Sequence, residues 1–291
     1  MKKCIFATAV AAVLLTACDG SEATHDSVNG NVKKDVTFVI DGDFGNATFR
    51  KSKPRLVTAV EGSDMQDVYV IDYVDGAFSQ FVHQTKNDAD FGRPSLSLAY
   101  GTHTLYFVAS RGSGSEIDTD SHVITWGSVK DTFYKMVEVD VSASSSPARN
   151  VTLDRVCTKI KINIKDDVPE GIASINLTPG LVYRGFDYVA DEPVDEVYES
   201  EYVIDVPDSY VGTKNLLSVS IFSLSGADEW TTDLKVLAKD TDGKSIGGVS
   251  IESVPLLRNR ATEYTGKLFI TDGTASMTLN DEWLPSYSDT W

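Results

Sequence analysis

The chain has 291 residues, 43 acidic against 26 basic side chains, a formal net charge of −17 and 42% hydrophobic residues. A protein this acidic repels nucleic-acid phosphates, so we expect no nucleic-acid partner. Its length is sufficient for one or two hydrophobic cores.

The first 17 residues have the features of an export signal. Lys2 and Lys3 precede an apolar run of 13 residues, Ile5–Ala17, which is shorter than the roughly 20 residues of a membrane-spanning helix. A basic start, a short apolar run and small residues at its end are typical of a secretory signal. Leu15-Thr16-Ala17 leads directly into Cys18, an arrangement that resembles the bacterial lipobox. The resemblance implies that the chain is cut before Cys18 and that its thiol is alkylated with diacylglycerol.

Cys18 is therefore predicted to tether the protein to outer-membrane lipid, because two or more acyl chains hold stably at about 0.8 kcal/mol per buried methylene. The alternative is an ordinary signal peptide followed by a chance cysteine. Cys4 leaves with the leader, so Cys157 has no partner for an internal disulfide. Asp19 and Glu22 also resemble the short acidic signals that send Bacteroidetes lipoproteins to the outer face of the cell.

Residues 18–33 are predicted to form a flexible spacer, and from Val36 onward the apolar residues alternate with period two. Asp75-Gly76 separates two alternating runs and predicts a hairpin turn, and the chain turns again at Tyr100-Gly101. Further alternating runs include "KMVEVDVSA", the long "VTLDRVCTKIKINIKD", "SEYVIDVPDS", "LLSVSIFSLSG" and "EYTGKLFI". No long segment has the three-to-four residue periodicity of a packing helix, so we expect an all-β sandwich protein.

The small polar residues of "SASSSPARN", 142–150, predict a domain boundary. We therefore expect a signal peptide at 1–17, the spacer at 18–33, one β-sandwich domain at 34–148 and a second at 149–291.

Several segments together resemble the Bacteroidetes fimbrillins, the FimA-related subunits of type V pili, and most closely their FimB-like anchor or accessory subunits. The segments are "DMQDVYVIDYVDGAFSQFV", "LSLAYGTHTLYFVAS", "NVTLDRVCTKIKINIKDDVPEGIASINLTP", "VPLLRNRATEYTGKLF" and "SMTLNDEW". The resemblance implies two tandem transthyretin-like β-sandwich domains with Greek-key-type connections. It also implies a lipoprotein precursor and assembly by β-strand exchange, in which an extended segment of one subunit completes a sheet of another.

The candidate exchangeable strand is Val36–Ile40, and the first arginines after Cys18 are Arg50 and Arg55. Cleavage at either by an arginine-specific protease separates the body from its lipid. Arg55 lies in the basic segment "RKSKPRLV", which makes it a plausible exposed site. The alternative is a surface loop whose positive charges balance neighbouring acidic residues, and an anchor subunit keeps both its lipid and its first strand.

These features favour a lipid-anchored accessory or anchor subunit of a fimbrium that serves cell adhesion, located at the outer membrane or cell surface. Its expected partners are other fimbrial subunits, membrane lipid through Cys18, and a host or bacterial surface ligand. Stalk and tip roles stay open, as does a surface glycan-binding lipoprotein of a nutrient-uptake system. A hydrolase ranks last: the four histidines are scattered, and no nucleophile, phosphate-binding or metal-binding motif occurs. We expect no enzyme activity and no cofactor.

Overall fold

The computed structural model describes residues 32–42, 58–59, 64–112, 114–269 and 276–279. Throughout this part the chain is all-β, as predicted, and its only helical element there is a single 3-10 turn, Asp208–Tyr210. None of these residues forms a helix with the length and hydrophobicity that crossing a membrane requires.

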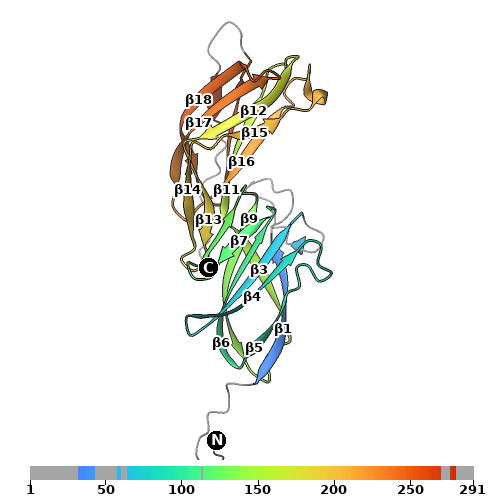
Figure 1. Cartoon of the computed structure of the whole chain (residues 1–291), viewed down its shortest axis with the longest axis vertical. Coiled ribbons are helices and arrows are strands. Elements are labelled where there is room, and N and C mark those ends of the chain that lie inside the picture. Colours follow the sequence, from blue (N-terminus) through green and yellow to red (C-terminus); the bar gives the residue numbers. More distant parts are fainter. Residues whose placement is uncertain (1–31, 43–57, 60–63, 113, 270–275, 280–291) are drawn as a thin grey trace, which may run out of the picture.

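The N-terminal half is one strongly curved sheet of eight strands (Figure 1). Its strands are β1 (Lys33–Gly42), β2 (Thr58–Ala59), β3 (Asp67–Val74), β4 (Ala77–Thr85), β5 (Ser95–Ala99), β6 (Gly101–Ser110), β9 (Thr132–Val141) and β10 (Ala148–Arg155). They follow the order β2-β1-β10-β9-β6-β3-β4, and β5 also pairs with β1. Alternate residues point inward and form one apolar cluster, to which β1, β5, β6 and β10 all contribute.

The Asp75-Gly76 hairpin turn is confirmed between β3 and β4, where Val74 pairs with Ala77. Both turn residues have positive φ, 51° and 76°, which is the backbone of a two-residue type I′ turn and explains the choice of Asp and Gly. The chain also turns at Gly101, but there β5 and β6 pair with different strands.

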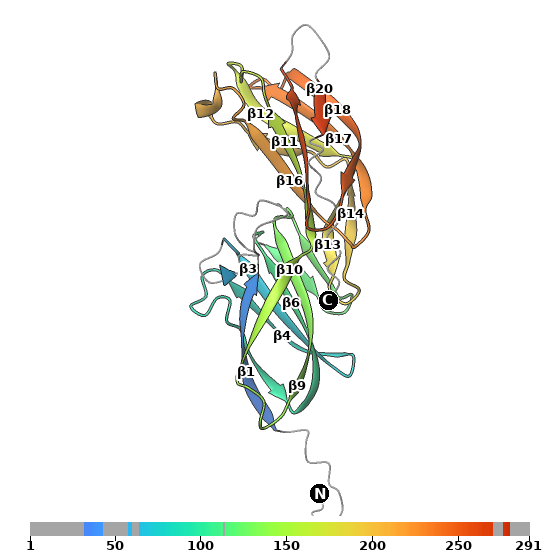
Figure 2. The same ribbon diagram turned by 180° about the vertical axis from the view of Figure 1, so that it is seen from behind.

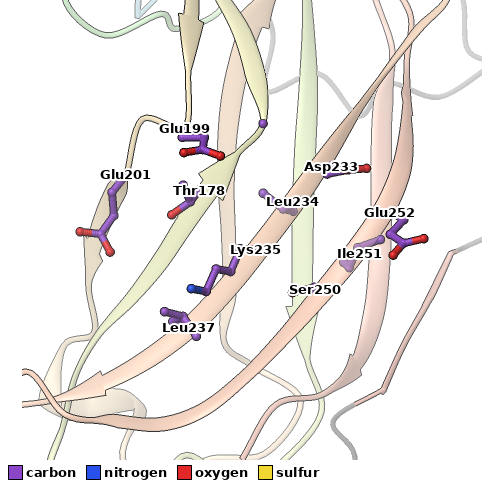
Figure 3. Close-up of a pocket in the computed structure, with 11 residues that line it drawn as sticks. Thr178, Glu199, Glu201, Asp233, Leu234, Lys235, Leu237, Ser250, Ile251 and Glu252 are labelled. Carbon is purple, nitrogen blue, oxygen red and sulfur yellow. The ribbon is translucent and has the colours of Figure 1, made fainter.

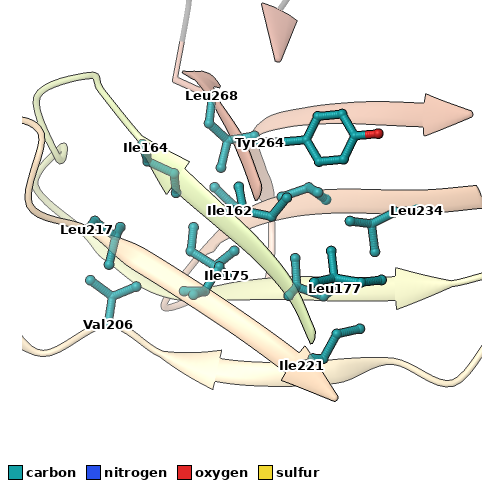
Figure 4. Packing of buried hydrophobic residues seen from close by; sticks show 14 of the residues in the cluster. Ile162, Ile164, Ile175, Leu177, Val206, Leu217, Ile221, Leu234, Tyr264 and Leu268 are labelled. Carbon is teal, nitrogen blue, oxygen red and sulfur yellow. The ribbon is translucent and has the colours of Figure 1, made fainter. Parts of the chain in front are cut away.

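The C-terminal half contains two four-stranded sheets with the orders β16-β11-β19-β20 and β15-β12-β17-β18. Their bounds are β11 (Cys157–Ile164), β12 (Ile172–Pro179), β15 (Tyr202–Asp205), β16 (Ser218–Leu224), β17 (Trp230–Asp240), β18 (Ser245–Leu256), β19 (Ala261–Lys267) and β20 (Ser276–Leu279). Figure 4 shows side chains of both sheets meeting in a second apolar cluster, with Ile162 and Ile164 from β11 near Ile175 and Leu177 from β12.

A fourth sheet joins the two halves. Its order is β14 (Glu192–Tyr198), β13 (Leu181–Asp187), β8 (Val123–Trp126) and β7 (Ser115–Asp118). The β7–β8 hairpin comes from between β6 and β9 of the first half, whereas β13 and β14 belong to the second half (Figures 1 and 2). A third apolar cluster lies at this junction and includes Trp126, Phe186 and Tyr188. The two halves therefore share hydrogen bonds and a core.

The predicted long strand over residues 151–166 is wrong in one respect, because it is two strands that meet at Val156. β10 pairs with β1 and β9, whereas β11 pairs with β16 and β19, so the chain passes from one sheet to the next at this residue. The division at 148/149 stays a prediction. It assigns nearly all of β10, Ala148–Arg155, to the second domain, whereas β10 is hydrogen-bonded to β1 and β9 of the first.

Candidate functional site

The predicted exchangeable strand lies within β1, which is internal to its sheet. Its first half, Lys33–Thr37, runs antiparallel to β5, and Thr37–Gly42 runs parallel to β10. The backbone N–H of Thr37 donates to the carbonyl of Pro147 at 2.8 Å, and that of Phe38 donates to Pro94 at 2.9 Å on the other side. β1 is thus hydrogen-bonded along both edges, and it fills a slot between β5 and β10.

Three alternate side chains anchor β1 in the core. Val36, Phe38 and Ile40 are all fully buried, and Phe38 contacts Phe107 edge-to-face with ring centroids 5.2 Å apart. Full burial of such a side chain contributes about 1.5–3 kcal/mol, so the three together stabilise the seated strand by roughly 5–9 kcal/mol. Without β1, the sheet would have two open edges and an apolar groove with three pockets.

Lys34 fastens the start of β1 to the loop between β9 and β10. Its ammonium group donates to the carbonyl oxygens of Ala143 at 3.0 Å, Ser142 at 3.5 Å and, more closely still, Ser145. Because carbonyl oxygens are acceptors only, three of them converging on one point favour a cation there. The "SASSS" loop, predicted as a domain boundary, therefore forms a lysine-binding turn at the end of the slot.

Cys18, Arg50 and Arg55 lie outside the described residues. The chain leaves β1 at Gly42 and is described again at Thr58, and these two residues are paired in the antiparallel β1–β2 ladder. The segment that carries both arginines therefore begins and ends beside the C-terminal end of β1.

Cys157, for which the sequence predicted no disulfide partner, is the first residue of β11. It is fully buried, and burial together with the nearby Asp131 carboxylate raises the pKa of its thiol. A thiol held neutral in this way is a poor nucleophile.

Sequence reasoning missed the ion pair beside Cys157. Arg155, at the end of β10, donates to both carboxylate oxygens of the buried Asp131 at 2.5 and 3.0 Å and to Asn259 Oδ1 at 2.9 Å. Asp131 precedes β9 and Asn259 precedes β19, so one guanidinium group connects the first half to the second. The segment "TLDRV" does not reveal this ion pair, because the partners of Arg155 are distant in sequence.

The histidines of the described region have structural contacts. His103 bridges a carboxylate oxygen of Asp72 at 2.7 Å and the carbonyl of Ala99 at 2.9 Å, and His83 stacks on Tyr69. Within the residues that the structure describes, no group of three His, Cys, Asp or Glu side chains could hold a metal ion.

An open groove of about 490 Å³ lies on the C-terminal half, over β12, β17 and β18 (Figure 3). Figure 3 shows Lys235 in the middle of the groove with acidic side chains on either side. These are Glu199, Glu201, Asp233 and Glu252. Hydrogen bonds from Asn176 and Lys239 lower the pKa of Glu201. The groove can offer carboxylate acceptors to a hydroxyl-rich or cationic ligand.

Residues 112–289 match the model of a family of unknown function, DUF6562. The chain belongs to the DUF6562 family. The matched residues begin just before β7, so they contain the junction sheet and the whole C-terminal half of this DUF6562 protein. No curated protein matches it.

Solved structures share the fold along most of the DUF6562 chain. A candidate adhesin from Bacteroides ovatus is 11% identical, with a TM-score of 0.51, over 89% of this chain and 100% of the other. A candidate polysaccharide-binding protein from Bacteroides thetaiotaomicron is 7% identical, with a TM-score of 0.53, over 85% and 96%. The fimbrial anchor protein Mfa2 from Porphyromonas gingivalis is 11% identical, with a TM-score of 0.45, over 86% and 98%.

The chain thus shares the fold of the candidate adhesin and of the candidate polysaccharide-binding protein, both from Bacteroides. None of these three structures is named as an enzyme. At such low identities the likeness shows a common fold.

Proposed function

We propose that this protein is a fimbrial subunit with two tandem transthyretin-like β-sandwich domains, attached to the outer membrane through a lipid on Cys18. In this proposal it serves as an anchor or accessory subunit and joins other subunits by β-strand exchange. The observation that carries the proposal is β1, an internal strand with three fully buried alternate side chains and hydrogen bonds along both edges. A slot of this kind accepts an extended segment through backbone hydrogen bonds and side-chain pockets.

The position of β1 in the chain supports the strand-exchange part of the proposal. It lies 15 residues after Cys18 and precedes Arg50 and Arg55, so a protease cut at either arginine separates β1 and the lipid from the rest of the protein. The fold that the chain shares with a candidate adhesin adds further support.

The mature N-terminus distinguishes an anchor from a processed subunit. We expect mass spectrometry of the protein from its native cells to find a lipid-modified Cys18. An N-terminus at Lys51 or Leu56 would instead support a processed, polymerising subunit, and an unlipidated start elsewhere would contradict both roles.

Strand exchange can be tested with the C18S chain cleaved by an arginine-specific protease. We expect a labelled peptide with the sequence of residues 33–42 to replace β1 in the cleaved protein, and a peptide with Phe38→Asp to fail. The R50A/R55A variant is the matched control, because its uncut β1 stays tethered beside the slot. Failure of the unaltered peptide to bind the cleaved protein would contradict the exchange mechanism.

The second candidate function is glycan binding, which the open groove around Lys235 and the fold shared with a candidate polysaccharide-binding protein favour. A ligand at a hundredfold excess over its Kd stabilises a folded protein by about 2.7 kcal/mol. Saccharide-dependent stabilisation that is lost in Lys235→Ala, in a protein that does not bind pilins, would favour this function over the first.

A further inference from the structure

We propose that this protein is a tension-resistant link, in which a pull between its N-terminal end and the far end of its second half is resisted by strands sheared lengthwise. This goes beyond the fimbrial proposal, because it follows from strand order and direction and needs neither a lipid nor a partner subunit. Three observations carry it: the β1–β10 pairing, the central position of β11, and the connection between β10 and β11.

The first observation is that the entry and exit strands of the first half are parallel neighbours. β1 and β10 pair over six residues, Thr37–Gly42 with Ala148–Leu153. The chain enters at the N-terminal end of β1 and leaves at the C-terminal end of β10, so tension pulls the two strands in opposite directions along their common axis. Their hydrogen bonds run across the strands and are evenly spaced. All of them are therefore loaded together instead of breaking one at a time.

The second observation is that the first strand of the second half is also central. β11 pairs with β16 over seven residues, antiparallel, and with β19 over six residues, parallel. Lys159 N–H donates to Arg260 at one end of the β11–β19 ladder, at 3.0 Å, and Lys165 N–H donates to Gly266 at the other, at 2.8 Å. A pull on the start of β11 must slide it past both neighbours.

Side chains reinforce this second ladder across the strands. Lys161 Nζ lies 3.3 Å from Glu263 Oε2, and Asn163 Nδ2 lies 3.3 Å from the same oxygen. At the first ladder, the contacts of Lys34 with the β9–β10 loop hold the loaded end of β1.

The third observation is that the two ladders lie in series. Val156 alone separates β10 from β11, and Figure 2 shows β10 rising from the lower half toward β11 in the upper half. Arg155 bonds to Asp131 on one side of this connection and to Asn259 on the other. Force that leaves β10 therefore passes into β11 at a point held by both halves.

Single-molecule pulling along two directions tests the proposal on one protein. Both variants use the full chain with Cys4 and Cys18 changed to serine. In the first, handles are attached through Lys33→Cys at the start of β1 and Asp242→Cys in the exposed β17–β18 turn. That turn lies at the far end of the second half, because Asp240 pairs with Ile172 at the start of β12. In the second, the handles are at Lys33→Cys and Ser97→Cys, on adjacent antiparallel strands, so that β1 is unzipped from β5.

We expect the lengthwise pull to need a rupture force at least about twofold that of the unzipping pull at the same loading rate, since forced unfolding is governed by the barrier along the pulled direction. Equal forces, or a weaker lengthwise direction, would overturn the proposal. Both double variants should unfold at the same urea concentration, because the cysteines replace exposed side chains, so a force difference reports the direction of pulling. Loss of strand exchange or of lipidation would leave this result unchanged.

Discussion

The central prediction concerns Phe38, the middle side chain of the three that anchor β1. Phe38→Ala removes a fully buried ring that packs edge-to-face on Phe107 at 5.2 Å. Deleting a buried phenylalanine side chain costs about 3–5 kcal/mol, because both its transfer free energy and the contacts around the new cavity are lost. The aromatic pair accounts for about 1 kcal/mol of this loss. We therefore expect the free energy of unfolding to fall by about 3–5 kcal/mol in total.

Urea unfolding followed by tryptophan fluorescence measures this loss, because Trp126 is buried at the junction of the two halves. Phe78→Ala is the matched control: Phe78 lies on edge strand β4 and is 43% exposed, so its removal should cost about 1 kcal/mol or less. A loss below about 1 kcal/mol for Phe38→Ala, or equal losses for the two variants, would refute the view that β1 is seated by its side-chain pockets.

Three further predictions concern the surroundings of β1 and β10. Arg155→Met should destabilise the protein by about 3 kcal/mol in urea, because the buried Asp131 loses its two close hydrogen bonds and keeps only Arg111, 3.9 Å away, as a charged partner. Adding Asp131→Asn should recover most of the loss, and a cost below about 1 kcal/mol would contradict the role of the pair. Lys34→Met should cost about 1 kcal/mol through its charged hydrogen bonds, whereas the exposed Lys33→Met should cost almost nothing; equal costs would rule out the loop contact. Cys157 should not react with a disulfide reagent at pH 8, because burial raises the pKa of its thiol. The thiol of an unfolded chain has a pKa of about 8.5. The contribution of Cys157 to stability is therefore full below about pH 8.5 and declines above it. Stability should therefore fall more steeply between about pH 8.5 and about 10 in the native protein than in Cys157→Ala, and parallel curves would contradict this.

The strand-rich fold could be predicted because half-buried strands leave an alternating apolar pattern in the sequence. β1 shows this directly: Val36, Phe38 and Ile40 are the inward positions, and the residues between them are only partly buried. The Asp75-Gly76 turn was equally visible, since few residue pairs adopt two successive positive φ angles.

The junction sheet was not predicted, and its strands show why. β7 and β14 consist mainly of exposed or half-exposed residues, so their apolar alternation is weak. β8 and β13 pair although they are separated by more than fifty residues, and such non-local pairing is set by tertiary packing. The break at Val156 was missed although the alternation changes phase there. The inward apolar residues are Val151 and Leu153 before it and Ile160, Ile162 and Ile164 after it, a change from odd to even positions that marks the exchange of one set of neighbouring strands for another.

For the candidate site, the sequence could give the strand but not its surroundings. Nothing local shows that β1 lies between β5 and β10, because those strands come roughly 60 and 110 residues later. The same holds for the lysine-binding loop and for the Arg155 ion pair, whose members are brought together only by the folded chain.

β1 is the element on which both the proposed strand exchange and the proposed resistance to tension depend, and a cut at Arg50 or Arg55 would change the outcome once the β1–β10 ladder breaks. In an uncut protein, the tether stays covalently joined through residues 43–57 after the β1–β10 ladder shears, so β1 can return to its slot and the link survives an overload. In a cut protein, the same event would separate β1, and any lipid attached through Cys18, from the body permanently. A permanent anchor under tension therefore benefits from a retained, uncut β1, whereas a subunit whose slot must accept another strand needs the cut. This physical difference separates the anchor role from the polymerising one. It also predicts that, pulled lengthwise repeatedly, the uncut protein recovers its first rupture peak after relaxation and the cleaved protein does not.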